Sequence, residues 1–160
     1  MRCILSNNKI RYRDLENVTD AITLYKDVMP GCSRPFTYVS KIGCIHLPSV
    51  TFSGYEHARR YCAQMLSDVF VEDIPGQTEE LWKYLQTKNF TTNASSWLGI
   101  KDGRWLNGEI VRNDLWFNAQ PVPPNPNMCA RMYHVNGKMY HSFCGFDGQT
   151  SICQRMSYNA

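Results

Sequence analysis

The stretch CARMYHVNGKMYHSFC, residues 129–144, sets two cysteines around an Asn-Gly pair. Asn136-Gly137 predicts a two-residue type I′ turn, because that turn needs positive φ at both central positions and Asn-Gly tolerates it best. With this turn, the antiparallel register places Cys129 directly opposite Cys144. Opposed Cα atoms lie about 4.5–5.5 Å apart, which is within disulfide range. The stretch therefore predicts a β-hairpin closed by a Cys129–Cys144 disulfide.

Two copies of Met-Tyr-His flank the turn, and they allow either a metal site or a decorated hairpin. In the predicted register Tyr133 faces Tyr140, while His134 and His141 lie diagonally on one face, about 7–8 Å apart between Cα atoms. A metal site usually needs three or four ligands. The nearest acid, Asp147, lies beyond the second cysteine. The pattern therefore favours two strand histidines on a half-solvated surface, with no metal.

The composition is that of one globular domain. The 160 residues are 43% hydrophobic and 19% charged, with a formal net charge of +3. Arg59-Arg60 is the only adjacent basic pair, so the dense basic patch that nucleic-acid binding needs is missing. No apolar run approaches the roughly 20 residues that span a bilayer. No apolar stretch follows Met1-Arg2, so we expect Met1 to begin a mature or shortened chain without a signal peptide.

Cysteines and glycosylation triplets both favour an oxidising, secretory origin. Seven cysteines are typical of a secreted domain of this size. Asn-x-Ser/Thr triplets occur at Asn17, Asn89 and Asn93, and each is a candidate glycosylation site. We expect a secreted protein or the extracellular part of a membrane protein. Cys3 is the expected odd cysteine: it links a disulfide-bonded dimer, bonds a cysteine upstream, or is a free thiol.

Hydrophobic spacing predicts strands at both ends of the main domain. Residues 1–31 are polar with some apolar residues at helical spacing, so we expect a neck or an extra element there. Residues 36–47 (FTYVSKIGCIHL) are β-branched and aromatic and predict a strand or hairpin. Residues 97–100 (WLGI) predict a short buried strand, and residues 152–153 a last strand.

Two amphipathic helices are predicted between these strands. The first begins at a capping box, in which Ser53 and Glu56 each bond the other's backbone N–H. The second begins with Thr78 as its N-cap. The expected buried residues are Tyr55, Ala58, Cys62, Met65 and Leu66 in the first helix, and Leu81, Trp82 and Leu85 in the second. An inward-facing Cys62 suits a structural disulfide better than a reactive thiol.

The order of these features resembles the long form of the C-type lectin-like domain, over residues 32 to about 155. Residues 97–100 (WLGI) are similar to the family's central Trp-Ile-Gly-Leu motif, and residues 105–108 (WLNG) resemble its Trp-x-Asp-Gly stretch. The resemblance implies an α+β fold for residues 32–160, with two helices, small antiparallel sheets and a long structured loop. It also implies the disulfides Cys32–Cys44 and Cys62–Cys153, beside Cys129–Cys144.

The same resemblance shows what this chain lacks. Sugar-binding members hold calcium with a Glu-Pro-Asn or Gln-Pro-Asp triplet, a further loop acid, and an Asn-Asp pair before the penultimate cysteine. Here the triplet is Gln120-Pro121-Val122, residues 123–127 contain no acid, and residues 139–141 (MYH) replace the Asn-Asp stretch. Calcium needs several hard oxygen ligands, and one amide oxygen does not suffice. We therefore expect neither a sugar-binding calcium site nor any other cofactor.

These observations predict a calcium-independent extracellular recognition module that binds a protein partner, or a glycan without metal. The expected surface is the long loop, residues 104–128, with the hairpin, residues 131–142, beside it. Its candidate residues are Arg104, Arg112, Trp116, Phe117, Gln120, Arg131, Tyr133, Tyr140 and His141, a mixture typical of interface hot spots. The ring of Trp116, like that of Trp105, is expected in the core.

Three other functions are possible, and one of them is a structural or disulfide-linked subunit with Cys3 as the link. The alternative is a carbohydrate-binding lectin with a non-standard or calcium-dependent site. Catalysis is not expected, because six cysteines have disulfide partners and the sequence has neither a Ser/His/Asp motif nor a Gly-rich phosphate loop.

Overall fold

The computed structural model describes residues 31–89, 94–118, 120 and 128–155. Its elements are β1 (Thr37–Val39), β2 (Gly43–His46), β3 (Phe52–Ser53), α2 (Tyr55–Gln64), β4 (Asp68–Val69), α3 (Gln77–Gln86), β5 (Ser95–Lys101), β6 (Arg104–Trp105), η2 (Asn113–Leu115), β7 (Met128–Tyr133), β8 (Met139–Phe143), β9 (Asp147–Ser151) and β10 (Cys153–Arg155). The predictions about Cys3, Asn17, Asn93, the N-terminal helix and residues 121–127 lie outside the described residues. The division of the chain at residue 31 also stays a prediction.

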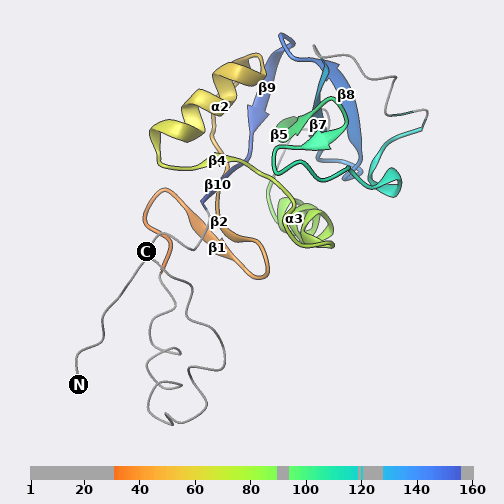
Figure 1. Cartoon of the computed structure of the whole chain (residues 1–160). Helices are drawn as coiled ribbons and strands as arrows, with labels where there is room; N and C mark the ends of the chain where they lie inside the picture. The colour runs from red at the N-terminus through yellow and green to blue at the C-terminus, as the bar shows by residue number, and fades with distance from the viewer. Residues whose placement is uncertain (1–30, 90–93, 119, 121–127, 156–160) are drawn as a thin grey trace, which may run out of the picture. The chain divides into compact units, whose positions relative to one another are not determined.

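The strands form two sheets. One has the order β1-β2-β10-β4, and the other has the order β3-β9-β5-β7-β8, with β6 on β5. Among these named strands every pairing is antiparallel except β5–β9, whose parallel pairing was not expected. β2 pairs with β10, with Ile45 opposite Gln154, so the first and last parts of the described domain lie side by side (Figure 1). The α+β class with two helices is as predicted. Within the described ranges, no helix is long and apolar enough to span a membrane.

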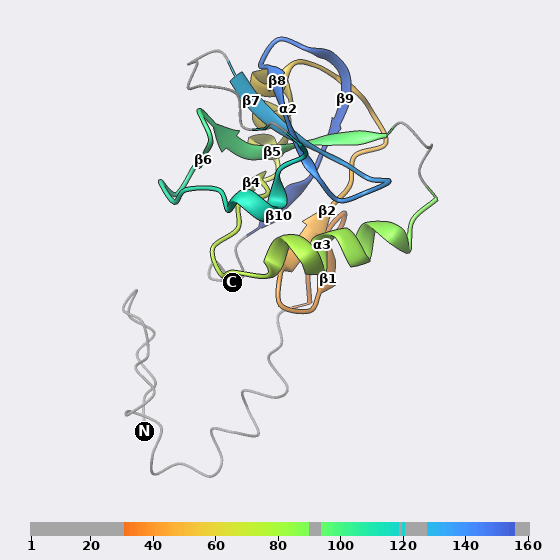
Figure 2. The same cartoon turned by 90° about the vertical axis from the view of Figure 1, so that its right-hand side faces the viewer.

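β5 lies between two clusters of buried side chains. Leu98 and Ile100 pack in one cluster with Leu81 of α3, whereas Trp97 packs in the other with Tyr55 of α2. Figures 1 and 2 show the two helices on different sides of the strands. Because each face of β5 meets a core, residues 95–100 are all buried, and residues 97–100 need no alternation with polar residues.

The predicted capping box at the start of α2 is wrong. The N-cap is Gly54, and no side chain bonds the cap position. The N–H of Tyr55 instead donates to the carbonyl of Cys144 at 2.7 Å. A Cβ at Gly54 would lie 2.8 Å from that carbonyl oxygen, so this close approach requires glycine. A contact with a distant segment thus replaces the local bonds expected between Ser53 and Glu56.

The start of α3 and the end of α2 also differ from the prediction. The N-cap of α3 is Gly76, not Thr78. The Thr78 N–H is one of the first N–H groups of the helix, which have no acceptor within the helix, and it donates at 2.9 Å to the carboxylate of Glu72. A side chain from before the helix therefore caps α3 in place of the Thr78 hydroxyl. α2 ends before Leu66, which has φ 53° and is 85% exposed rather than buried. The other predicted helix positions are buried or partly buried, as expected.

All three predicted disulfides are present: Cys32–Cys44, Cys62–Cys153 and Cys129–Cys144. Cys62–Cys153 joins α2 to β10 over a sequence separation of 91 residues. Both of its cysteines are fully buried, which agrees with the structural role predicted for Cys62. Cys62–Cys153 therefore joins segments that are distant in the sequence, whereas Cys32–Cys44 closes the segment of β1 and β2, and Cys129–Cys144 closes the hairpin.

The predicted hairpin register is wrong by two residues. β7 pairs with β8 so that Cys129 faces Ser142, Arg131 faces Tyr140, and Met132 faces Met139. The loop is longer than two residues, since the Gly137 N–H donates to the Tyr133 carbonyl at 2.9 Å. Gly137 has φ 66°, but Asn136 is not among the described residues with positive φ, so the turn is not type I′.

Contacts outside the hairpin explain the longer loop. The N–H of His134 donates to the carbonyl of Ala94, and the His134 carbonyl accepts bonds from Trp82 Nε1 at 3.1 Å and Gln86 Nε2 at 2.6 Å. These bonds draw His134 away from the β8 strand toward α3 and the start of β5. A shift of two residues keeps each side chain on its predicted face, because side chains alternate along a strand. For this reason the Cys129–Cys144 disulfide still forms, with a Cα–Cα distance of 5.0 Å.

Candidate functional site

A row of aromatic rings crosses the outer face of the hairpin. We call it the aromatic ladder, and it consists of Phe117, Tyr140, Tyr133, Arg131 and Phe146. The Phe117 and Tyr140 rings stack with centroids 4.6 Å apart, and the Tyr140 and Tyr133 centroids are 4.4 Å apart. The Arg131 guanidinium carbon lies 5.0 Å from the Tyr133 centroid and 4.5 Å from the Phe146 centroid. Three separate chain segments therefore build one continuous surface.

The long loop reaches this surface by pairing with the edge of the sheet. β8 is the edge strand, and Trp116 forms a parallel bridge with Met139. The Phe117 N–H donates to the Met139 carbonyl at 2.9 Å, and Gln120 Oε1 accepts from the His141 N–H at 3.0 Å. These bonds occupy backbone groups that an edge strand otherwise leaves open. They also place the Phe117 ring beside Tyr140.

The inner face of the hairpin belongs to the core. Met132 and Met139 are fully buried, and Trp116 is 6% exposed, so the expectation that Trp116 packs in the core is confirmed. Its ring meets the His141 imidazole edge to face, with centroids 4.5 Å apart. Burial lowers the pKa of His141, which favours the neutral imidazole in this contact. Trp116 and His141 thus pack together at the inner face of the hairpin, and the predicted role of His141 in partner binding stays a prediction.

Arg131 is held rigidly within the ladder. Its Nε donates to Ser142 Oγ at 2.6 Å, and its Nη1 donates to Ser95 Oγ at 3.3 Å. Within the described residues no carboxylate forms an ion pair with it. Its charge is therefore not neutralised by a described carboxylate, while the two hydroxyls and two rings fix its orientation.

Arg112, another predicted partner-binding residue, is paired with acidic side chains of its own domain. It forms ion pairs with three carboxylates, those of Glu72, Glu79 and Asp114. The hydrogen bond with Glu79 raises the pKa of Arg112 above its ordinary value. Because Glu72 also accepts the Thr78 N–H, Arg112 helps to fix the start of α3. Its described ion pairs all lie within the domain, and its predicted role in partner binding stays a prediction.

Arg104 also lies outside the aromatic ladder. The candidate residues predicted from the sequence did not include two exposed phenylalanines. Arg104 Nη1 donates to the Gly108 carbonyl of its own turn at 3.1 Å. Phe143 and Phe146, on either side of Cys144-Gly145, are 61% and 45% exposed. The Phe146 N–H donates to the Phe143 carbonyl at 2.9 Å, so the two rings flank a turn. Among the predicted glycosylation sites, Asn89 is described and is exposed, just after α3.

His134 is not the half-solvated surface residue that the sequence predicted. It is 3% exposed, and its Nε2 forms a 2.8 Å hydrogen bond with Ser96 Oγ. Burial lowers its pKa to about 4, so the imidazole is neutral at pH 7. His134 and His141 therefore have separate surroundings. Nowhere in the described ranges do three or more His, Cys, Asp or Glu side chains gather as a metal site.

Comparisons with known proteins identify the fold. No family model matches this chain. The secretory phospholipase A2 receptor of Pongo abelii is 24% identical over 124 residues, which cover 66% of this chain. The chain spans 8% of the length of that curated relative.

Solved structures give the same result. The mouse scavenger receptor C-type lectin carbohydrate-recognition domain matches with a TM-score of 0.61 and 19% identity, covering 78% of this chain and 98% of that one. The cow CD23 carbohydrate-recognition domain, crystallised in the presence of a GlcNAc2Man3 oligosaccharide, matches with a TM-score of 0.62 and 20% identity, covering 78% and 95%. The predicted C-type lectin-like fold is therefore confirmed.

Proposed function

We propose that this chain, whose fold is that of C-type lectin carbohydrate-recognition domains, is an extracellular recognition module that binds a protein partner through the aromatic ladder without calcium. The observation that carries the proposal is the ladder itself, a partly exposed and internally braced row of four rings and one arginine. The three disulfides of the domain favour an oxidising, extracellular environment. Binding, not catalysis, is the function that this surface supports.

The composition and rigidity of the ladder favour a protein ligand. Tyr and Arg are the residues most enriched at interface hot spots, together with Trp. Phe117 and Phe146 are 40% and 45% exposed, so a partner gains by covering them. Because ring contacts and backbone bonds already hold the ladder in place, little side-chain entropy is lost on binding.

The surroundings of Arg131 indicate which chemical group the partner presents to it. A guanidinium between two rings, with no carboxylate partner among the described residues, suits an Asp or Glu side chain from another protein. The rings on each side suit apolar side chains flanking that acid. We therefore expect the partner to present a carboxylate surrounded by apolar residues.

The arrangement around Gln120 supports binding without calcium. Gln120 was the one remaining side chain that could match the family's calcium triplet, and its Oε1 accepts the His141 N–H. Tyr140, in place of a metal-ligating residue, stacks on Phe117. The expected result is a melting temperature that changes by less than about 1 °C between millimolar calcium and a chelator. A rise of several degrees with calcium would contradict the proposal, since a ligand at 100 times its Kd adds about 2.7 kcal/mol.

The ladder is tested with variants after a partner has been recovered from extracellular proteins. Tyr140→Ala should weaken binding of that partner about 30-fold, the effect of losing a hot spot worth about 2 kcal/mol. Tyr38→Ala is the matched control, because Tyr38 is 51% exposed on β1 in the other sheet. Unchanged affinity for Tyr140→Ala, measured by surface plasmon resonance, would refute the proposed surface. Loss of binding after enzymatic removal of the partner's glycans would favour the carbohydrate-binding alternative.

A further inference from the structure

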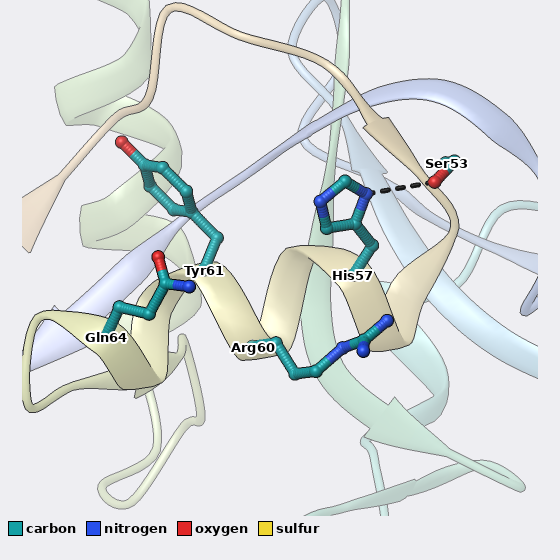
Figure 3. A pocket seen from close by; sticks show the side chains of 5 residues that line it. All are labelled: Ser53, His57, Arg60, Tyr61 and Gln64. Atoms are coloured by element: carbon teal, nitrogen blue, oxygen red, sulfur yellow. Dashed lines mark hydrogen bonds between the residues drawn. The ribbon is translucent and has the colours of Figure 1, made fainter.

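A polar pocket on α2 is formed by residues outside the aromatic ladder. It has a volume of about 380 Å³ and is lined by Ser53, His57, Arg60, Tyr61 and Gln64. Four of these residues are three or four positions apart along α2, so they share one face of the helix. Figure 3 shows their side chains on the same side of the helix, with Ser53 just before its first turn.

The rings of this pocket have fixed orientations. His57 Nδ1 forms a 2.9 Å hydrogen bond with Ser53 Oγ (Figure 3), which leaves Nε2 on the opposite edge of the imidazole. The buried Phe52 ring contacts both His57, with centroids 5.6 Å apart, and Tyr61, with centroids 5.1 Å apart. His46, which is on β2 in the sheet that does not contain β3, stacks on Tyr61. The pocket therefore has an aromatic wall that is braced from behind.

Its electrostatics favour a negatively charged ligand. The lining contains a guanidinium, an amide, an imidazole and two hydroxyls, and no carboxylate. Arg60 Nε donates only weakly, to the Glu56 carbonyl at 3.4 Å, and Arg60 has no carboxylate partner within the described ranges. The adjacent Arg59, by contrast, is paired with Asp68 at 2.9 Å.

Two acids lie near the pocket, and neither lines it. The Glu56 carboxylate is directed to Lys101 Nζ, at 3.9 Å. Asp147 is the backbone partner of Ser53 in the β3–β9 pairing and is exposed. The charge inside the pocket is therefore the uncompensated charge of Arg60.

We propose that this pocket binds a small oxyanion, a carboxylate or a sulfate, carried by a ligand small enough to stack on its aromatic wall. Arg60 supplies the charge and paired N–H donors, a geometry that matches both anions. Gln64, Tyr61 and His57 supply further hydrogen-bonding groups around it. A volume of about 380 Å³ lies within the range of small-molecule sites, and it accommodates a single charged sugar ring. This site does not depend on the proposed function of the ladder.

The experiment uses the whole chain, labelled with ¹⁵N, at constant ionic strength. The probes are sodium sulfate, glucose 6-sulfate, glucuronate and glucose. We expect glucose 6-sulfate and glucuronate to shift the His57 imidazole and Arg60 Nε–H resonances saturably, and glucose to have no effect. If sodium sulfate binds as tightly as glucose 6-sulfate, the oxyanion site is supported and the sugar ring contributes nothing. Absence of saturable shifts with all three anions would overturn the proposal.

Variants separate a built site from general electrostatic attraction. Arg60→Gln should weaken glucose 6-sulfate binding about tenfold or more, because it removes charge-assisted hydrogen bonds. Arg104→Gln is the control, since Arg104 is exposed, has no carboxylate partner in the described part of the chain and lies on β6. Equal loss in the two variants would overturn the proposal. Tyr140→Ala should leave oxyanion binding unchanged, so failure of the ladder and failure of this pocket are distinguishable.

Discussion

Gly137 is a position where one added methyl group should be costly. It has φ 66°, and a Cβ there would lie 2.5 Å from Trp82 Cγ on α3. A Gly137→Ala variant must therefore adopt a left-handed backbone and push the hairpin tip away from the indole. The same movement stretches the hydrogen bond from Trp82 Nε1 to the His134 carbonyl, which is 3.1 Å long.

The expected magnitude is the sum of two effects. A left-handed alanine costs about 1–2 kcal/mol relative to glycine. Forcing a methyl group into a packed contact typically costs a further ~1–3 kcal/mol. We expect Gly137→Ala to lower the free energy of unfolding by about 2–4 kcal/mol, given that some of the strain is relieved by movement of the tip. At roughly 3 °C for each kcal/mol, the melting temperature should fall by about 6–12 °C.

Gly103 provides the matched control. It has φ 73°, but a Cβ there would meet no heavy atom within 4 Å. Gly103→Ala should therefore show only the backbone cost of about 1–2 kcal/mol. In a Trp82→Ala background, the cost of Gly137→Ala should fall to the same value, because the clash has been removed.

Urea unfolding, followed by fluorescence and circular dichroism, gives the four free energies of the Gly137–Trp82 double-mutant cycle. The coupling between the two positions should be at least about 1 kcal/mol. Equal destabilisation by Gly137→Ala and Gly103→Ala would refute the reasoning. A cost of Gly137→Ala that is unchanged in the Trp82→Ala background would also refute it.

Two further predictions concern the hairpin. Burial lowers the pKa of His134 to about 4, against an ordinary 6.5, so between these pH values the unfolded chain binds the proton more readily than the folded chain. The fold therefore has its full stability above pH 6.5 and loses stability as the pH falls toward 4, by up to about 1.4 kcal/mol per pH unit. Because burial also lowers the pKa values of His46 and His141, the check is that His134→Gln flattens this dependence; an unchanged slope would contradict the assignment. Replacing both Cys129 and Cys144 by Ser opens a loop with a separation of 15 residues and should cost about 3 kcal/mol in thermal or urea unfolding. A loss below ~1 kcal/mol would show that the hairpin is held by its other contacts.

The sequence predicted faces and cross-links better than registers and caps. The faces of β7 and β8 follow from the alternation of side chains, which a two-residue shift preserves. The register depended on His134, and its partners Ala94, Trp82 and Gln86 are distant in sequence. The capping box at Ser53 failed for a similar reason, since the carbonyl of Cys144 competes for the helix N-terminus.

The candidate site shows the same limit. Phe117, Tyr133, Tyr140 and Arg131 were predicted from composition, and the structure brings them together. Composition also selected Arg112 as a candidate binding residue. Composition, however, carries no information about which arginine will be surrounded by carboxylates. The distinction between an arginine available to a partner and an arginine used by the fold depends on tertiary contacts alone.

The two-residue shift also determines what the ladder contains. In the predicted register Arg131 would face Ser142, and Tyr133 would face Tyr140. In the structure Arg131 faces Tyr140, so the guanidinium lies within the row of rings instead of beside it. Since contacts of the hairpin tip with α3 hold this register, we expect Trp82 to influence the proposed binding surface. Gly137→Ala should therefore weaken partner binding as well as stability, whereas Gly103→Ala should reduce stability alone.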